Sequence, residues 1–186
     1  MALISAKTIL TSLSLFHITL AFFFFTNPES IADQALVYVL GEAMGMPQTT
    51  AFNTPTPTTS FLSIALLVLG LSDILSLSMP EEIWLVHYWG SQTPLRVILF
   101  SILTIFTFLT SGSSKRGGGR MSHPVAPSGL GLAAGGGWGG LRNRVFFTFA
   151  FFEMLSWFWV WVTLREEAGR FTQRKRRRSS AAAERY

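Results

Sequence analysis

The chain has 186 residues, of which 49% are hydrophobic and 13% charged, and it carries a formal net charge of +5 and no cysteine. A soluble domain normally has about 25% charged residues, so the charge content here is roughly half of the usual value. The lack of cysteine excludes a disulfide-stapled module and a Cys-ligated zinc or iron–sulfur site. Because the charges gather in connecting segments and near the C-terminus, the sequence indicates an integral membrane protein.

Four stretches are long and apolar enough to cross a bilayer, which needs about 20 residues at a rise of about 1.5 Å each. They cover residues 9–26, 60–79, 94–110 and 145–164. None has the polar face that a helix of a soluble core would turn to water. We therefore expect an all-α fold, a membrane bundle of four transmembrane helices within residues 1–168, followed by a basic cytoplasmic tail over residues 169–186.

Residues 27–46, between the first two spans, are acidic and contain no base. On a helix, the polar side chains of Asp33 and Glu42 would lie opposite a set of apolar residues. This set consists of Ala32, Leu36, Val39, Leu40 and Ala43. The pattern predicts an amphipathic helix at the membrane surface or against the bundle.

Residues 80–93 contain Trp84 and Trp89, whose rings favour the membrane–water interface. Ser78 and Glu81 have the spacing of a capping box, which marks the start of a helix. We therefore expect a second short interfacial helix in this connection.

Residues 111–143 contain 11 of the 16 glycines. A glycine-rich loop can cradle phosphate, but the Walker pattern that ends in G-K-[ST] is lacking and no strand precedes the segment. We therefore expect a disordered linker here.

Three tryptophans, Trp157, Trp159 and Trp161, precede Arg165 near the end of the fourth span. Tryptophan concentrates at the headgroup level of membranes. Because residues two apart on a helix point in different directions, we expect the three rings to surround the end of the span. Plain core packing is the alternative for Trp157 alone, which shares the helix face of Glu153.

The C-terminal tail contains a dense basic run. It consists of Arg174, Lys175, Arg176, Arg177 and Arg178. Such a run beside a span normally contacts anionic lipid headgroups, at about 1 kcal/mol per residue. Direct nucleic-acid binding is disfavoured because no aromatic side chains that could stack on nucleobases lie among the basic residues. A retrieval signal built on spaced arginines is the remaining alternative.

Positive charge near the ends of spans tends to stay in the cytoplasm. With four spans, the termini and the second connection share one side, which carries ten basic residues, Arg96 among them, against five on the other side. We therefore expect both termini in the cytoplasm.

The informative ionisable residues of the spans are His17, Asp73 and Glu153. A charge at the bilayer centre costs about 2.5–3.5 kcal/mol on insertion scales, so such residues normally face the bundle and find a partner. At about 1.5 Å per residue, their depths from the cytoplasmic end are roughly 12, 9 and 16 Å. We therefore expect the three side chains to meet in one layer of the bundle interior.

Such a layer has two interpretations. It is either a satisfied polar clasp that fixes the helix register, or a ligand pocket, proton relay or ion path. No nucleophile constellation and no metal-ligand spacing accompanies these residues in the sequence, which favours the clasp and predicts neither a catalytic residue nor a metal or other cofactor.

Several dispersed blocks of the sequence carry a family resemblance. They are residues 1–8 (MALISAKT), 14–17 (SLFH), 26–28 (TNP), 31–34 (IADQ), 41–45 (GEAMG), 72–73 (SD), 78–82 (SMPEE), 88–96 (YWGSQTPLR), 153–155 (EML) and 164–167 (LREE). These blocks resemble the fungal increased-loss-of-mitochondrial-DNA family. The resemblance implies a small multi-pass protein, associated mainly with the endoplasmic reticulum membrane and indirectly with mitochondrial genome maintenance, and it implies no particular reaction.

Three function hypotheses follow. The first is a non-catalytic bundle of the endoplasmic reticulum membrane that supports mitochondrial DNA indirectly. The second is a sterol- or lipid-binding membrane protein, or an enzyme, with an intramembrane carboxylate pocket, which is an analogy at the level of the fold alone. The third is an ion or proton conductor that uses His17, Asp73 and Glu153.

Overall fold

A computed structural model describes residues 4–112 and 139–183 of the chain, and over these residues it contains helices and no strand. Four of the described helices are long and apolar enough to cross a membrane. The candidate spans are Ala6–Thr26, Pro57–Ser76, Ile83–Thr110 and Arg144–Arg174. The prediction of an all-α fold with four membrane-spanning helices is confirmed.

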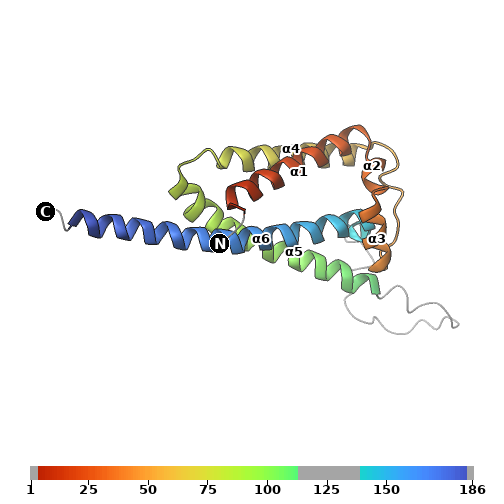
Figure 1. Cartoon of the computed structure of the whole chain (residues 1–186). Coiled ribbons are helices and arrows are strands. Elements are labelled where there is room, and N and C mark those ends of the chain that lie inside the picture. Colours follow the sequence, from red (N-terminus) through yellow and green to blue (C-terminus); the bar gives the residue numbers. More distant parts are fainter. Residues whose placement is uncertain (1–3, 113–138, 184–186) are drawn as a thin grey trace.

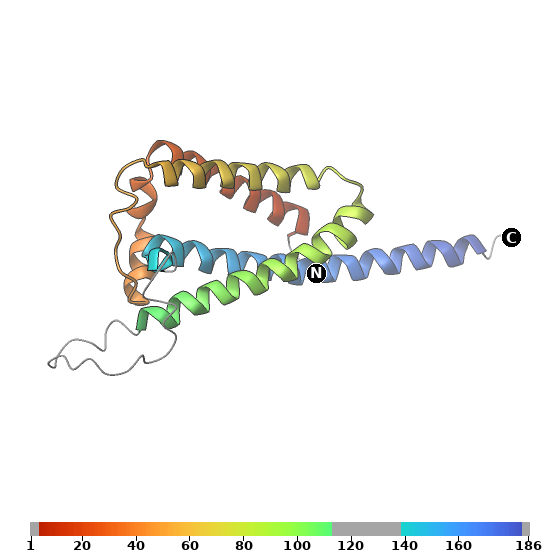
Figure 2. The same cartoon turned by 180° about the vertical axis from the view of Figure 1, so that it is seen from behind.

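The long helices associate in two pairs, as Figures 1 and 2 show from opposite sides. Helix α1 (Ala6–Thr26) packs along α4 (Pro57–Ser76), and helix α5 (Trp89–Gly112) packs along α6 (Arg144–Ala183). The contacts between the pairs are fewer and run mainly from α1 to α6. The molecule is therefore two helix pairs joined along a narrower seam.

Short elements close both ends of this arrangement. Helices α2 (Glu29–Ala32) and α3 (Ala35–Ala43) follow α1 and pack against the start of α6. At the other end, the π-helix η1 (Ile83–Tyr88) connects α4 to α5. Because the chain traverses the bundle four times, the start of α1 and the end of the apolar part of α6 lie at the same end.

Polar side chains mark where the long helices begin. Ser5 caps α1 by accepting a hydrogen bond from the Thr8 backbone N–H at 3.2 Å. Thr56 and Thr59 form a capping box at the start of α4, where Pro57 occupies the first turn. Asn143 caps α6 by accepting from the backbone N–H of residue 146 at 2.8 Å. Each cap satisfies backbone donors that the first turn of a helix leaves unpaired.

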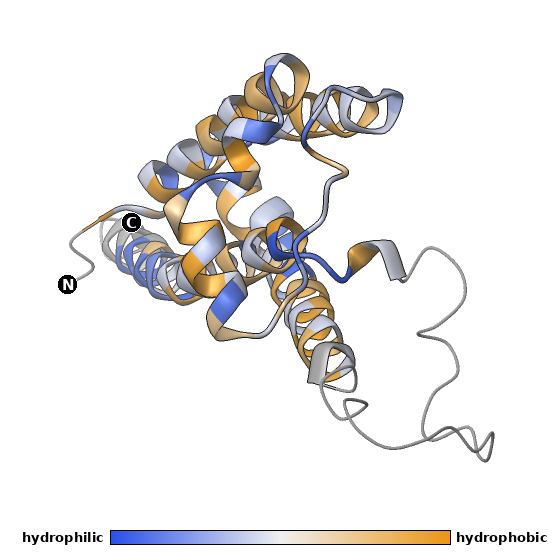
Figure 3. Ribbon diagram, turned by 90° about the vertical axis from the view of Figure 1, so that its right-hand side faces the viewer, coloured by the Kyte–Doolittle hydropathy of each residue, from blue (hydrophilic) through white to orange (hydrophobic). Residues whose placement is uncertain are grey.

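The outward faces of the long helices carry large apolar side chains. Examples from the four helices are Phe22, Leu75, Leu109 and Trp159, all of which are more than half exposed. Figure 3, a ribbon coloured by hydropathy and seen along the bundle, shows hydrophobic residues along the long helices and the hydrophilic C-terminal part of α6 behind them. A soluble monomer rarely exposes so much apolar surface, whereas lipid solvates it.

The expected separate helix in residues 80–93 is not observed. The π-helix η1 passes directly into α5, and Trp84 and Trp89 are buried in the core instead of lying at the surface. Ser78 donates its hydroxyl to the Leu75 carbonyl at 2.7 Å, an interaction at the end of α4. The third membrane helix therefore begins earlier in the chain than residue 94.

The amphipathic segment 27–46 forms two short helices and not one, because the helix is interrupted after Ala32. This break rotates the second part, so the residues that α3 buries are Val37 and Gly41. Leu36 and Val39, expected on the apolar face at the membrane surface or against the bundle, are 62% and 63% exposed. Of the two predicted locations for the apolar face, packing against the bundle is therefore not the one that Leu36 and Val39 adopt.

The Gly-rich segment 111–143, expected to be disordered, lies mostly outside the described residues. Within the described part, α5 extends to Gly112, and Gly139–Leu141 forms the 3₁₀ helix η3 before the Asn143 cap. The expected disorder is therefore wrong for these two edges. At the other end of α6, the expected boundary between residues 168 and 169 lies within a continuous helix.

Helix α6 is the longest element of the described chain. Its 40 residues correspond to a length of roughly 60 Å. A hydrocarbon core is about 30 Å thick, so the second half of α6 extends beyond it. Figure 1 shows this part projecting past the other helices.

Candidate functional site: a paired charge cluster between the helix pairs

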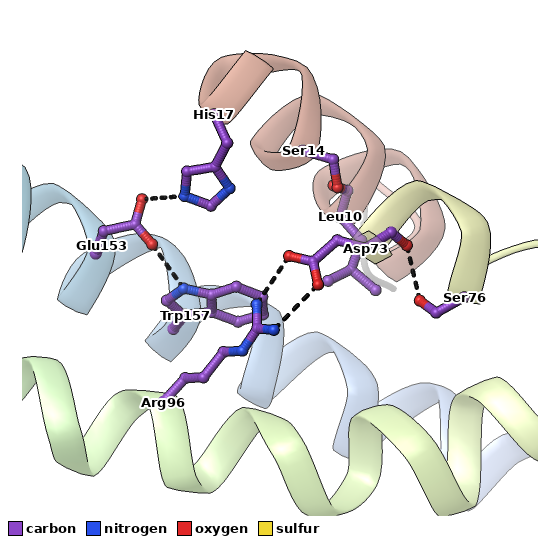
Figure 4. Close-up of polar contacts among 8 residues, drawn as sticks. All are labelled: Leu10, Ser14, His17, Asp73, Ser76, Arg96, Glu153 and Trp157. Carbon is purple, nitrogen blue, oxygen red and sulfur yellow. Dashed lines mark hydrogen bonds and ion pairs between the residues drawn. The ribbon is translucent and has the colours of Figure 1, made fainter. Parts of the chain in front are cut away.

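Each of the four long helices contributes one charged or ionisable side chain to the seam between the two pairs. His17 lies on α1, Asp73 on α4, Arg96 on α5 and Glu153 on α6. His17, Asp73 and Glu153 are almost fully buried, with exposed fractions of 0%, 2% and 1%. Figure 4 shows these four side chains pointing toward one another from the two pairs.

His17 and Glu153 connect α1 to α6. The His17 Nε2 atom lies 2.9 Å from the Glu153 Oε1 atom. The other carboxylate oxygen, Oε2, accepts a hydrogen bond from the indole Nε1–H of Trp157 at 2.8 Å. Both oxygens of the buried carboxylate therefore have a partner, which offsets the cost of removing it from water.

Asp73 and Arg96 connect α4 to α5. The guanidinium donates two hydrogen bonds to the carboxylate, from Nη1 to Oδ2 at 2.8 Å and from Nη2 to Oδ1 at 3.0 Å. This parallel two-bond geometry is the strong form of an arginine–carboxylate pair. The Arg96 side chain is 18% exposed and that of Asp73 is 3% exposed, so the pair lies within the bundle.

Trp157 links the His17–Glu153 pair to the Asp73–Arg96 pair. Besides donating to Glu153, its ring lies under Arg96, with the guanidinium carbon 4.5 Å from the ring centroid. Trp89 stacks on Trp157 with a centroid distance of 5.5 Å and an interplanar angle of 20°. A cation over an aromatic face is attracted by the ring quadrupole, so the rings stabilise the guanidinium of Arg96 in the bundle interior, where it is largely removed from water.

The three residues expected in one layer lie in one cluster, and two of them are bonded to each other. His17 and Glu153 meet directly, whereas Asp73 has a partner of its own, Arg96, within the same cluster. Trp157, expected at headgroup level, is 1% exposed and belongs to the core, whereas Trp159 lies on the outer surface. Trp157 shares the helix face of Glu153, and it takes the alternative that the sequence left open for it, packing in the core.

Arg96 was missed because its position near a predicted span end assigned it to the cytoplasmic charge count. An arginine has a long side chain, so a backbone near the end of a span can place a guanidinium within it. The signal was present in the sequence. Asp73 near the end of one span and Arg96 near the start of the next fall at similar depth, and a buried aspartate requires a partner.

Small residues bring α1 and α4 close together beside the cluster. A Cβ atom added at Gly70 would lie 2.8 Å from the Ser14 carbonyl oxygen and 2.8 Å from Cγ1 of Ile18. The Ser63 hydroxyl donates to the Ala21 carbonyl of α1 at 2.8 Å. Such close approach and hydrogen bonding across helices is typical of membrane helix pairs.

A few buried polar atoms around the cluster have no hydrogen-bond partner among the described residues. They are Nδ1 of His17, Nε1 of Trp89 and Oγ1 of Thr93. No three His, Cys, Asp or Glu side chains of residues 4–112 and 139–183 are grouped as a metal site would require. The cluster can therefore hold the two helix pairs together through electrostatic interactions and hydrogen bonds. It can also transfer a proton between His17 and Glu153.

The expected lipid-contact residues lie far from this cluster. Helix α6 continues through all five of them, Arg174, Lys175, Arg176, Arg177 and Arg178. Of the five, Arg174 lines a surface cavity at the end of the bundle where the chain begins. The basic run is therefore part of a projecting helix, and its first residue reaches back to the bundle.

Four apolar helices with paired charges between them define a multi-span helical membrane protein. The family model described as increased loss of mitochondrial DNA protein 1 (Ilm1) matches residues 4–174, so the chain belongs to this family. The chain is 22% identical to "Protein ilm1" of Schizosaccharomyces pombe over 160 residues, which are 86% of this chain and 81% of that protein. No solved structure matches the chain. The family resemblance seen in the sequence is confirmed.

Proposed function

We propose that this chain is a non-catalytic multi-pass protein of the endoplasmic reticulum membrane that supports mitochondrial DNA maintenance indirectly. The name of the family connects its members with loss of mitochondrial DNA. The basic run 174–178 lies on a projecting helix without interleaved aromatic side chains, which favours contact with lipid headgroups over contact with DNA. An indirect route, through lipid, ion or protein homeostasis, fits this arrangement.

The pairing of the interior charges carries this proposal. Nε2 of His17 bonds to Glu153, and the guanidinium of Arg96 bonds to Asp73, at 2.8–3.0 Å. Both carboxylates have each of their oxygens bonded, so neither presents an unoccupied oxygen to a substrate. Such closed pairs serve to hold helices in register. The cluster is therefore a clasp between the two helix pairs.

Replacement of Glu153 by glutamine tests this role. In the Glu153→Gln variant, the amide oxygen accepts from Trp157 and the amide N–H donates to His17 in its other neutral tautomer, so both hydrogen bonds remain. The ability to ionise is lost. A clasp needs the hydrogen bonds alone, and we expect this variant to restore mitochondrial DNA retention as well as the unchanged chain in a Schizosaccharomyces pombe strain that lacks its relative.

The matched control is Glu153→Ala, which leaves His17 and Trp157 without their partner. We expect its level in the membrane and its complementation to fall together. A Glu153→Gln protein that is present at the normal level but fails to complement would contradict the clasp and favour a proton or ion conductor. Imaging of the tagged chain should show the endoplasmic reticulum, and a purely mitochondrial signal would argue against an indirect role.

We propose in addition that both termini lie in the cytoplasm. The start of α1, the connection between α4 and α5 and the C-terminal part of α6 lie at one end of the bundle. Since Arg96 belongs to the interior, nine basic residues remain on this side against five on the other. This distribution still favours a cytoplasmic location of the terminal end.

A second candidate function is binding of a sterol or another lipid. An apolar groove of about 340 Å³ runs between α1, the α2–α3 segment and α6, with Phe16, Phe23 and Phe152 in its wall. Thr148 also lines it, and the Thr148 hydroxyl is buried with no partner among the described residues. A lipid that carries a hydroxyl group would supply that partner. Mass spectrometry of the purified protein would detect a stoichiometric lipid.

A further inference from the structure

A second cavity, of about 480 Å³, lies at the end of the bundle where the chain begins, and it is distinct from the charge cluster and from the apolar groove. The first turn of α1, the segment before η1 and α6 after Leu164 meet there. Its charged lining consists of Lys7, Arg170 and Arg174 together with Glu81 and Glu167, and Trp84 forms part of its apolar wall. We refer to it as the terminal cavity.

The terminal cavity lies at the level where membrane meets water. Lys7 is in the first turn of α1, and Glu81 follows the end of α4 by a few residues. On α6, the lining residues begin shortly after Leu164, where the apolar part of the helix ends. A cavity at this depth in a four-span bundle is adjacent to phospholipid headgroups on one side and to acyl chains below them.

The charges of the terminal cavity are incompletely compensated. Glu167 accepts a hydrogen bond from the Ala6 backbone N–H at 2.9 Å, so one of its oxygens is already engaged. Arg170 contacts Glu166 at 3.3 Å, an exposed pair that contributes little. Lys7 and Arg174 form no ion pair with any described residue. Three basic and two acidic side chains line the cavity, so basic charge exceeds acidic charge by one, with Glu81 and Glu167 as the acidic counterparts.

We propose that the terminal cavity binds the headgroup of an anionic aminophospholipid of the phosphatidylserine type. This headgroup carries two anionic groups, the phosphate and the carboxylate, and one ammonium group. Lys7, Arg170 and Arg174 supply the donors for the anionic groups, and Glu81 accepts from the ammonium group. Trp84, although mostly buried, forms part of the apolar wall, which would contact the glycerol of the lipid.

The source of the phosphate follows from the position of the site. A soluble phosphoserine compound has the same charged groups, but the cavity opens at the end of membrane-spanning helices and includes apolar side chains. The site also differs from contact of the whole run 174–178 with an anionic surface: of the described side chains of that run, Arg174 lines the cavity, whereas Arg176 and Arg177 do not. The inference depends on the four-span architecture and is independent of the proposed role in mitochondrial DNA maintenance.

Native mass spectrometry of the full-length protein in detergent micelles tests the site, with short-chain phosphatidylserine as the probe. In the Lys7→Gln/Arg174→Gln variant two cationic contacts are lost. At about 1 kcal/mol each, the affinity for phosphatidylserine should fall about 30-fold. The control is Arg165→Gln/Arg177→Gln, which removes the same charge from α6 positions outside the cavity lining and should change the affinity by less than about threefold.

The ammonium contact is tested by Glu81→Gln. This variant should bind phosphatidylserine more weakly, while phosphatidic acid, which lacks the ammonium group, should bind at least as well as before. Circular dichroism and thermal unfolding of every variant establish that the fold is retained. Equal losses in the cavity variant and in its control would overturn the site and leave a non-specific basic surface. Competition by glycerophosphoserine as effective as that by the lipid itself would overturn the assignment to a membrane lipid.

Discussion

The helices within the α1/α4 pair and the helices on opposite sides of the seam are held together in different ways. Between α1 and α4, the contact depends on small residues, with Gly70 against the backbone of Ser14 and Ser63 bonded to the backbone of α1. Across the seam, side chains form the Asp73–Arg96 ion pair and the His17–Glu153 hydrogen bond. In lipid, no hydrophobic force drives apolar helix surfaces together. Helix association therefore depends on close packing of the backbones in the α1/α4 pair and on polar interactions across the seam.

The difference concerns distance and specificity. A small residue lets two helix backbones come into contact, and it does not require a particular residue on the partner helix. A charged side chain spans a larger separation and requires one particular partner, because an unpaired charge in the membrane is costly. The seam therefore determines which helix of one pair faces which helix of the other, with α1 opposite α6 and α4 opposite α5.

The α5/α6 pair adds a third type of contact. Its surface is built from rings, with Phe100 against Phe149 at a centroid distance of 6.1 Å and Trp89 stacked on Trp157. Aromatic pairs of this kind contribute about 0.5–1.5 kcal/mol beyond the area they bury. Trp157 also contacts Arg96 and Glu153. The aromatic packing of the α5/α6 pair therefore also holds the charged residues of the seam in position.

The largest effect should come from breaking one charge pair of the seam. Asp73→Ala leaves Arg96 without its carboxylate inside the bundle, and loss of one partner of a buried pair costs about 3–5 kcal/mol. We expect this loss in the free energy of unfolding measured in mixed micelles. Leu75→Ala, at an exposed position of the same helix, serves as the control and should cost much less.

Removal of both charges sharpens this test. In the Asp73→Ala/Arg96→Leu double variant no unpaired charge remains, and we expect it to be more stable than Asp73→Ala alone. If the double variant loses as much free energy of unfolding as Asp73→Ala and Arg96→Leu lose together, the two charges act independently. The seam would then not depend on their pairing.

A smaller effect should follow from adding one methyl group within the α1/α4 pair. In Gly70→Ala, the new Cβ would lie 2.8 Å from the Ser14 carbonyl oxygen, so the helices must separate, at a cost of about 1–3 kcal/mol. The matched control is Gly169→Ala on α6, where no atom lies within 4 Å of the added Cβ. Thermal unfolding should show a loss for the first and no loss for the second, and equal behaviour would contradict close packing at Gly70.

The smallest effect should come from one interhelical hydrogen bond. Ser63→Ala removes the donor to the Ala21 carbonyl, and such bonds in membrane proteins average about 0.6 kcal/mol. Ser91→Ala is the comparison, since the Ser91 hydroxyl bonds to the His87 carbonyl of its own helix. Unfolding in mixed micelles should show a small loss for Ser63→Ala, and a loss above about 2 kcal/mol would place this bond with the charge pairs.

The sequence predicts the class of fold and the locations of the four spans because apolar length is a local property of the chain. It also indicates His17, Asp73 and Glu153 as interior groups, since a charge in an apolar run must avoid lipid. It misassigns residues 80–93, where Trp84 and Trp89 have the composition of an interfacial helix but lie in the core. Composition measures amphipathic character, and only the neighbouring helices decide whether a ring meets lipid headgroups or another ring.

The amino-acid sequence by itself determines that this protein is a bundle of four apolar helices and that the charges within them need partners. Both properties follow from the free energy of transferring each residue from water to lipid. The tertiary structure alone decides which partner each charge has. Asp73 pairs with Arg96 and not with His17 or Glu153, since the rotation of each helix about its axis is fixed by contacts far apart in the chain. The terminal cavity arises in the same way, because Lys7, Glu81 and Arg174 meet only when three helix ends assemble.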